Sequence, residues 1–281
     1  MTSPRSLLDG ATRRLSAAGV GSPRVDAELL LAHCLGVERS SLPTLDDVDP
    51  GAARAFGDAV TRRAAREPLQ HIVGRAAFRY LDLAVGPGAF VPRPETELLV
   101  DAIRPGLGLG IGGAPIVVDL CAGTGALALA IAQEVPGARV YAVERSAAAL
   151  AWLRRNTAGT DVTVVEGDVT DDDLLPDLRG RVDAVVSNPP YVPAGTPVEP
   201  EVRADPDEAV FAGDDGLGVI PDVIARAEAL LRPGGVLAIE HDDTHGEAVP
   251  ALLGVGWRDV ADHRDLGGRP RYATAVRAAA R

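Results

Sequence analysis

The sequence contains no lysine, and all 28 of its basic residues are arginine. A pyridoxal phosphate enzyme needs a lysine for its Schiff base, and a Walker A loop needs one for its phosphates, so both classes are excluded. Cysteine is scarce as well, with only Cys34 and Cys121, which lie far apart in the chain. We expect two buried thiols rather than a disulfide framework or a zinc knuckle, and no redox chemistry.

Long hydrophobic runs are also missing. No stretch approaches the roughly 18 uninterrupted apolar residues of a membrane-spanning helix, and the first stretch, MTSPRSLLDGATRRL, has no apolar segment like that of a signal peptide. The 281 residues are 46% hydrophobic and 24% charged, which fits a globular protein of one large or two ordinary domains. We therefore predict a cytoplasmic protein that does not contact a membrane.

The net charge of −12 is unevenly distributed along the chain. Residues 1–93 hold 12 arginines against 10 acidic residues, whereas the remainder holds 16 against 30. Because affinity for nucleic acid depends on neutralising its phosphates, the acidic remainder argues against wide contact with DNA or RNA. It would tolerate a basic protein partner, although such acidity commonly serves solubility alone.

The N-terminal region has the pattern of a small helical domain. Three helices are expected there, over residues 7–19, 22–36 and 50 to about 66. Ser22 or Asp26 would cap the second helix. Leu29, Leu30 and Leu31 would form its buried stripe.

Residues 75–91 change to a strand-like composition around a Gly-Pro-Gly turn, which indicates a β-hairpin between two domains. We therefore predict a helical domain over 1–73, a hairpin linker over 74–93 and a catalytic domain over 94–281. The glycine-rich stretch 106–113 is expected to be a loop before the next strand.

From residue 115 onward, strand and helix patterns alternate, which predicts a doubly wound, mostly parallel α/β sheet. Candidate strands are 116–121, 139–144, 162–167, 182–187 and 236–241, and candidate helices include 125–135 and 146–156. The segments 257–265 and 271–277 follow without a helix between them, so we expect a terminal antiparallel hairpin. This departs from the plain dinucleotide-binding (Rossmann) order and raises the methyltransferase variant of that fold.

The first of these strands leads into a glycine-rich turn, DLCAGTGALALA. Glycines at such a turn let backbone N–H groups and a ligand approach closely. Gly123, Gly125 and Ala128 match the dinucleotide fingerprint G-x-G-x-x-A, and Glu144, 21 residues after Gly123, stands where a ribose-binding acid belongs. The spacing alone leaves both a nicotinamide and another adenosine cofactor open.

Acidic residues at three successive strand ends favour S-adenosylmethionine. Asp119 can meet a cationic amino group but would repel a pyrophosphate. Asp168 can accept a hydrogen bond from an adenine amine, with Val169 against the ring. Each acid alone could be a solvated loop residue. Ligands bind at the carboxyl ends of such strands, so three acids at three successive strand ends favour a binding site.

The fourth strand ends in SNPPY. Pro189 and Pro190 lack a backbone N–H and fix φ, so they end the strand in a rigid turn, which is the plain structural interpretation. The Asn188 side-chain oxygen and the Pro189 carbonyl can also each accept one N–H of a substrate amine or amide, and so hold its nitrogen toward a methyl donor. Tyr191 would pack on the planar group. Such a site works by orientation and needs no metal.

The sequence closely resembles the bacterial glutamine methyltransferases that act on peptide chain release factors, the PrmC or HemK type. The resemblance covers almost the whole chain, through SPRVDAELLLAHCLG, REPLQHIVG, FVPRPETELLV, DLCAGTG, SNPPY, DDGLGVI and LRPGGVLAIEH. NPPY is shared with enzymes that methylate adenine in DNA. The PRPETE stretch at 92–97 is more specific and favours the release-factor enzymes over those that modify a ribosomal protein.

This resemblance implies methyl transfer from S-adenosylmethionine to the side-chain amide nitrogen of the glutamine in the Gly-Gly-Gln motif of class I release factors, modulating translation termination. The glutamine would be bound by Asn188, Pro189, Pro190 and Tyr191. The cofactor would be bound by Asp119, Cys121, Ala122, Gly123, Thr124, Gly125, Glu144, Asp168, Val169 and Asn188. The helical domain would contact another part of the release factor, and we expect a monomer that needs no direct contact with nucleic acid.

Two alternatives remain open at this point. One is another methyltransferase, acting on adenine in nucleic acid or on a ribosomal protein, and the other is a non-catalytic module that binds an adenosine ligand. His241 and His245 have the spacing of a helical metal pair, but a strand should end at His241 and the glutamate of a zincin helix is missing, so we expect no metal site. Arg269 and Arg271 are interpreted as turn and edge-strand residues.

Overall fold

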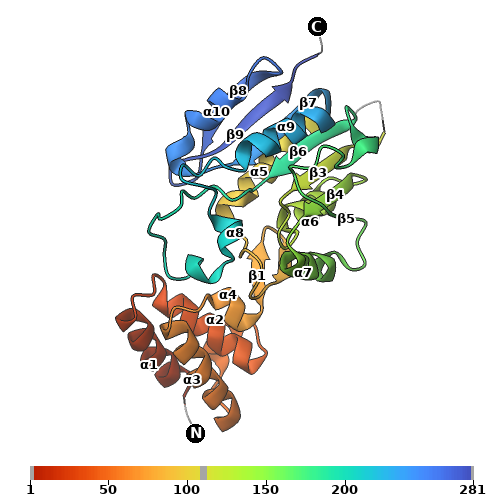
Figure 1. Cartoon of the computed structure of the whole chain (residues 1–281). Helices are drawn as coiled ribbons and strands as arrows, with labels where there is room; N and C mark the ends of the chain where they lie inside the picture. Colours follow the sequence, from red (N-terminus) through yellow and green to blue (C-terminus); the bar gives the residue numbers. More distant parts are fainter. Residues whose placement is uncertain (1–2, 108–112, 280–281) are drawn as a thin grey trace. The chain divides into compact units, whose positions relative to one another are not determined.

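The computed structural model describes residues 3–107 and 113–279, which form two compact units (Figure 1). The first unit holds the described residues up to Arg75 together with Val198–Ala204, and the second holds Ala76–Pro197 and the described residues from Asp205 onward. The segment 198–204 therefore belongs to the helical unit although it follows SNPPY in the sequence. The domain limits 1–73, 74–93 and 94–281 stay a prediction.

The first unit is helical, as expected. Its elements are α1 (Pro4–Ala17), α2 (Pro23–Leu35), η1 (Arg39–Thr44), α3 (Pro50–Ala64) and α4 (Leu69–Val73). The first three α-helices each begin with a proline, whose missing N–H is not needed at a helix start. The three predicted helices are confirmed to within a few residues. The five-residue α4 is too short to give a periodic signal.

Two expectations for α2 are wrong. Ser22 occupies the N-cap position but makes no side-chain capping hydrogen bond, and Asp26 accepts instead from Nε of Arg63 at 2.7 Å. Leu30 and Leu31 are fully buried, whereas Leu29 is 37% exposed. Three consecutive residues span about 200° of an α-helix, so they cannot all face one side.

The hairpin between the domains is shorter than expected. Strands β1 (Arg75–Phe78) and β2 (Leu81–Ala84) form a two-stranded sheet. The chain reverses at Arg79, which adopts a φ of +51°, and at Tyr80. The Gly-Pro-Gly stretch follows β2, so its assignment as the hairpin turn is wrong. After it come η2 (Pro94–Thr96), α5 (Glu97–Ile103) and η3 (Arg104–Leu107).

A seven-stranded sheet forms the centre of the second unit, with the strand order β5-β4-β3-β6-β7-β9-β8. Its strands are β3 (Ile116–Leu120), β4 (Arg139–Glu144), β5 (Thr163–Glu166), β6 (Val182–Ser187), β7 (Leu231–Glu240), β8 (Trp257–Arg264) and β9 (Pro270–Arg277). The first five are parallel, and β9 runs antiparallel between β7 and β8. The predicted mostly parallel sheet with a terminal antiparallel hairpin is confirmed. Strand β7 begins five residues before the expected start.

Helices cover both faces of this sheet (Figure 1). They are α5, α6 (Ala126–Glu134) and α7 (Ala147–Thr157) on one face, and α9 (Ile220–Leu230) and α10 (Ala248–Leu252) on the other. The four-residue α8 (Asp207–Val210) and the short turns η4 (Pro176–Leu178) and η6 (Asp243–His245) belong to the loops of this unit, and η5 (Val202–Ala204) lies in the first unit. Neighbouring residues of β3 point to opposite faces. Val117 packs in one core with Ile131 of α6, and Val118 packs in the other with Leu230 of α9.

Three further expectations concern the chain as a whole. Cys34 and Cys121 are free thiols, but both are half-buried rather than buried. Of the glycine-rich stretch 106–113, residues 108–112 lie outside the described part of the chain, and residues 106 and 107 end η3. No helix in the described ranges is long and apolar enough to cross a membrane.

Candidate active site

The carboxyl ends of β3 and β6 lie side by side where the strand order changes direction, because β4 and β5 lie beyond β3 and β7 lies beyond β6. Leu120 at the end of β3 pairs in register with Ser187 at the end of β6. The glycine-rich turn and the SNPPY turn therefore leave the sheet next to each other. Ligands of open α/β sheets bind at this kind of position.

The glycine-rich turn needs unusual backbone conformations. Cys121, Gly123 and Gly125 have φ values of +63°, +57° and +87°. A Cβ atom added to Gly125 would lie 2.6 Å from Cδ1 of Leu153 in α7, whereas one added to Gly123 would meet no atom within 4 Å. Gly125 is therefore required for packing, and Gly123 faces open space in which a ligand can approach the backbone.

The rest of the turn is fixed by its neighbours. The Ala122 N–H donates to the Val143 carbonyl at 2.9 Å, and the Thr124 carbonyl accepts from Nδ2 of Asn156 at 2.9 Å. Burial raises the pKa of the Cys121 thiol to about 12, and the charges of nearby carboxylates add to this effect. The thiol is therefore neutral at physiological pH.

Asp119 is a buried carboxyl with one oxygen unused. Its side chain is fully buried in β3, and Oδ2 accepts from the Ala128 N–H at 3.0 Å. Oδ1 has no hydrogen-bond partner among the described residues. Burial raises the pKa of Asp119 well above its usual value, and Glu144 adds to the shift. A buried polar atom without a partner is unfavourable, so Oδ1 indicates a place for the donor of a bound ligand.

Glu144, at the end of β4, holds the glycine-rich turn to the sheet. Its Oε2 accepts from the Gly123 N–H at 2.8 Å. Its Oε1 accepts from the N–H groups of Arg145 and Ser146 at 2.9 and 2.8 Å. A carboxylate has about four acceptor positions, so Glu144 can still accept from a ligand hydroxyl.

Asp168 follows the end of β5 and lies in a tight turn. Its Oδ1 accepts from both the N–H and the hydroxyl of Thr170 at 2.9 Å, and its Oδ2 pairs with Arg145 at 3.1 Å. The bonds from Thr170 lower the pKa of Asp168, and Arg145 lowers it further. Val169 is buried in the core. Asp119, Glu144 and Asp168 thus stand at or just beyond the carboxyl ends of three adjacent strands.

The SNPPY turn is rigid and well anchored. Ser187 donates to the Leu120 carbonyl at 2.7 Å, which joins the ends of β6 and β3. Nδ2 of half-buried Asn188 donates to Oγ1 of Thr96 at 3.0 Å, which leaves Oδ1 available as an acceptor. Pro189 and Pro190 are buried, and the Tyr191 N–H donates to a carbonyl of α8 at 3.2 Å.

A buried glutamate lies behind this turn. Tyr191 donates through its hydroxyl to Oε1 of Glu240 at 2.8 Å, and Glu240 is 1% exposed at the end of β7. Burial raises the pKa of Glu240 to about 7, although the nearby Thr96 and Tyr191 hydroxyls and the charge of Arg271 act in the opposite direction. Burial and the Glu240 charge raise the pKa of Tyr191.

Sequence reasoning did not single out Thr96 or Glu240. Both lie in stretches that carried the family resemblance, PRPETE and LAIEH. The only local signal was an acidic residue at the end of an otherwise apolar strand.

Arg271, expected as an edge-strand residue, lies on β9, which has neighbours on both sides, and it pairs with Asp265 at 3.4 Å. That expectation is therefore wrong for Arg271.

His241 and His245 both have protein partners. Nε2 of His241 lies 3.0 Å from Oδ1 of Asp262, and burial lowers the pKa of His241. Nε2 of His245 lies 2.9 Å from the Asp215 carbonyl. Within the part of the chain that the structure describes, no group of three or more His, Cys, Asp or Glu side chains is arranged to hold a metal ion.

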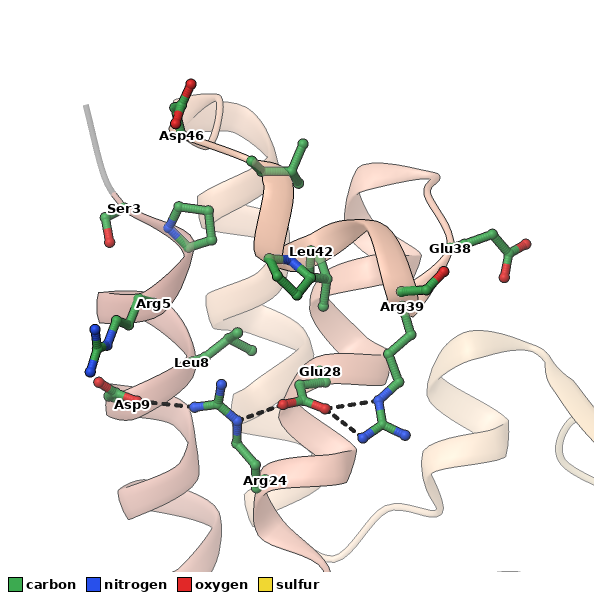
Figure 2. Close-up of a pocket in the computed structure, with 14 residues that line it drawn as sticks. Ser3, Arg5, Leu8, Asp9, Arg24, Glu28, Glu38, Arg39, Leu42 and Asp46 are labelled. Atoms are coloured by element: carbon green, nitrogen blue, oxygen red, sulfur yellow. Dashed lines mark hydrogen bonds and ion pairs between the residues drawn. The ribbon is translucent and has the colours of Figure 1, made fainter.

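A separate cavity of about 1020 Å³ lies in the helical unit (Figure 2). Arg24 lines this cavity and forms ion pairs with Asp9 at 3.0 Å and with Glu28 at 2.6 Å. Arg39 forms a second ion pair with Glu28 at 2.6 Å. None of the residues predicted for the chemistry lines this cavity.

Comparison with known proteins identifies the class of this fold. The description "PrmC N-terminal domain" matches residues 6–74, and "Methyltransferase small domain" matches residues 95–202. A 16S ribosomal RNA methyltransferase from Thermus thermophilus is 23% identical with a TM-score of 0.50, covering 72% of this chain and 49% of that one. A methyltransferase from Pyrococcus furiosus, 17% identical, has the same TM-score and covers 72% and 92%. The second unit is a methyltransferase domain.

Relatives of similar length define the family. The release factor glutamine methyltransferase of Mycolicibacterium smegmatis is 53% identical over 99% of each chain. The enzyme of the same name from Streptomyces coelicolor is 53% identical, covering 95% of this chain and 96% of that one. The chain belongs to the release factor glutamine methyltransferase family.

Proposed function

We propose that this protein transfers a methyl group from S-adenosylmethionine to the side-chain amide nitrogen of the glutamine in the Gly-Gly-Gln motif of class I release factors. The names of the relatives and the methyltransferase domain support this activity. The structural observation that carries it is Asn188, whose nitrogen is bound to Thr96 so that its oxygen is left to accept from a substrate amide.

The residues at the strand ends fit the cofactor. When bound, S-adenosylmethionine supplies an electrophilic methyl group on a sulfonium sulfur. The unpartnered oxygen of Asp119 suits its cationic amino group, and the open space at Gly123 gives its chain access to the backbone. Glu144 would accept from the ribose hydroxyls and Asp168 from the adenine amine. Cys121, Ala122, Thr124, Gly125 and Val169 would complete the contacts.

The substrate nitrogen is activated by position rather than by a base. An amide nitrogen is a weak nucleophile because its lone pair is delocalised. Asn188 Oδ1 and the Pro189 carbonyl would each accept one of its N–H groups, and Tyr191 would pack on the planar amide beside Pro190. Holding the nitrogen in line with the methyl group converts binding energy into rate. The nitrogen gains the methyl group and releases one proton.

The partner is expected to be a protein. The acidic C-terminal two-thirds of the chain disfavours direct binding of nucleic acid and tolerates a basic partner surface. The helical domain would contact a part of the release factor away from its Gly-Gly-Gln motif. We place the reaction in the cytoplasm, away from any membrane, with the enzyme acting as a monomer.

The experiment is transfer of a labelled methyl group to a purified class I release factor, beside its Gly-Gly-Gln to Gly-Gly-Ala variant and unmethylated duplex DNA. Label on the wild-type factor alone is the expected result. Label on DNA would move the protein to the adenine methyltransferases, and cofactor binding without any transfer would favour a non-catalytic module.

Asn188→Ala separates the two halves of the site. The variant is expected to lose transfer because one of the two acceptors for the substrate amide is gone. Calorimetry with S-adenosylmethionine should show largely retained affinity, because Asn188 is only one of the ten residues expected to contact the cofactor. If the variant loses cofactor affinity as well, the separate roles assigned to Asn188 and the glycine-rich turn are wrong.

A further inference from the structure

We propose that Gly216 and His245 are positioning residues, which keep the SNPPY turn where its acceptors can hold the substrate glutamine. They act through the loop 211–218, which lies between α8 and α9. This inference rests on the proposed function, because it assumes that the glutamine binds at the SNPPY turn. Neither residue has to touch the substrate.

The loop 211–218 is hydrogen-bonded to the backbone that directly follows the two prolines of the substrate turn. The N–H groups of Tyr191 and Val192 both donate to the Val210 carbonyl, at 3.2 and 2.9 Å. The Ala212 N–H donates in the opposite direction, to the Val192 carbonyl at 3.0 Å. The two segments thus form a short parallel β-bridge. A movement of the loop is therefore passed directly to the substrate turn.

Gly216 lies against the backbone of this turn. Its φ is +75°, and a Cβ atom added to it would lie 2.3 Å from the carbonyl oxygen of Tyr191 and 3.0 Å from Cδ of Pro193. Cβ atoms essentially never approach another atom more closely than 3.0 Å, and a backbone oxygen cannot turn away as a flexible side chain can. Any side chain at Gly216 therefore moves the loop and the turn apart by about 0.7 Å, the difference between 2.3 and 3.0 Å.

His245 holds the loop at the residue before Gly216. Its Nε2 lies 2.9 Å from the Asp215 carbonyl. Because a carbonyl can only accept, this nitrogen must carry the ring hydrogen. His245 is 6% exposed, and its Nδ1 has no hydrogen-bond partner among the described residues. A buried polar atom without a partner is unfavourable for folding, so stability alone does not explain a histidine at this position.

The place of the turn matters because Asn188 Oδ1 and the Pro189 carbonyl are the two acceptors proposed for the substrate amide. Pro189 and Pro190 have fixed φ angles, so the turn can absorb little of a shift that begins at Tyr191. A misplacement of about 1 Å can lower a rate about 100-fold, because the nitrogen is no longer held in line with the methyl group. The loop 211–218 therefore controls the rate of transfer rather than cofactor binding.

The first test compares Gly216→Ala with Gly213→Ala. Gly213 lies in the same loop with a φ of +74°, but a Cβ atom added to it would meet no atom within 4 Å. Both variants carry the same backbone strain, and only Gly216→Ala displaces the Tyr191 carbonyl. We expect kcat to fall roughly 10- to 100-fold in Gly216→Ala and to stay within about threefold of the wild type in Gly213→Ala. KM for the release factor and affinity for S-adenosylmethionine should change less than about threefold in both, since the interaction lost is one made in the transition state.

The second test compares His245→Gln with His245→Met, two unbranched side chains of similar length. Glutamine can still donate to the Asp215 carbonyl, whereas methionine leaves this carbonyl without a donor. We expect kcat to fall roughly tenfold in His245→Met and to stay within about threefold of the wild type in His245→Gln. Each variant is assayed well below its own unfolding temperature, measured by circular dichroism, so that a loss of folded protein does not imitate a loss of rate.

Wild-type kcat in Gly216→Ala, an equal loss in Gly213→Ala, or equal kcat in the two His245 variants would overturn the inference. If Gly216→Ala does not fold, the two His245 variants decide alone. A wild-type enzyme without transfer to the release factor would instead refute the proposed function, and the inference with it.

Discussion

Gly123 and Gly125 make a matched pair, because they lie two residues apart in the same turn and differ in what a methyl group would meet. Both have positive φ, which costs a residue with a side chain about 1–2 kcal/mol. At Gly125 the added Cβ would also lie 2.6 Å from Cδ1 of Leu153. Leu153 is fully buried, so it cannot simply move aside, and overpacking of this kind typically adds about 1–3 kcal/mol.

Gly125→Ala should therefore lower the free energy of unfolding by about 2–5 kcal/mol and Gly123→Ala by about 1–2 kcal/mol. Affinity for S-adenosylmethionine should fall more in Gly123→Ala than in Gly125→Ala. The methyl group of Gly123→Ala would enter the open space assigned to the cofactor, and we expect its affinity to fall at least about tenfold, or 1.4 kcal/mol.

Urea unfolding followed by tryptophan fluorescence measures the stability of the second unit, which contains the glycine-rich turn. The protein has two tryptophans, Trp152 and Trp257, and both lie in the second unit, with Trp152 next to Leu153 in α7. Calorimetry gives the affinity. Equal stability of the two variants would refute the packing role of Gly125, and wild-type affinity in Gly123→Ala would refute the placement of the cofactor.

Two further predictions concern the helical unit. Burial raises the pKa of Glu201, but hydrogen bonds from Arg66 and Arg63, at 2.6 and 2.7 Å, outweigh it and lower the pKa to about 2. Because the folded-state pKa lies below the unfolded value, the resulting stability is present above about pH 4.5 and is lost as the pH falls toward 2. Glu201→Gln should therefore destabilise the helical unit by about 3 kcal/mol at pH 7 and remove this pH dependence of its stability. Far-ultraviolet circular dichroism measures both effects, and an acid transition unchanged from the wild type would contradict this prediction. Leu30→Ala should cost about 2–5 kcal/mol because Leu30 is fully buried, whereas Leu29→Ala, at a 37% exposed position, should cost less than about 1 kcal/mol, and similar losses in urea unfolding would show that α2 faces another way.

The regular parts of the fold could be predicted from the sequence because their signals are local. Strand β6 was predicted with its observed limits, since an apolar run ends there at two prolines. The expected buried stripe of α2 was wrong at Leu29, because successive residues lie about 100° apart around an α-helix and three in a row cannot all face the core. The prediction of the hairpin turn was wrong because the chain reverses at Arg79. Arginine is not one of the residue types that usually mark a turn, yet Arg79 adopts a positive φ.

The candidate site was predicted as far as its residues follow strand ends. Asp119, Glu144 and Asp168 were found because parallel strands place their carboxyl ends at one edge of the sheet. Thr96 and Asn188 come from distant parts of the chain and meet only through folding, as do Glu240 and Tyr191, so no spacing relates them. The same holds for Glu201, whose two arginine partners precede it by more than 130 residues.

The most direct test of the central claim is tandem mass spectrometry of a class I release factor after incubation with this enzyme and S-adenosylmethionine. The account predicts that the factor gains the mass of one methyl group, and that fragmentation places it on the side-chain amide of the Gly-Gly-Gln glutamine. A methyl group at any other position, or an unmodified factor in the presence of cofactor-bound enzyme, would contradict it.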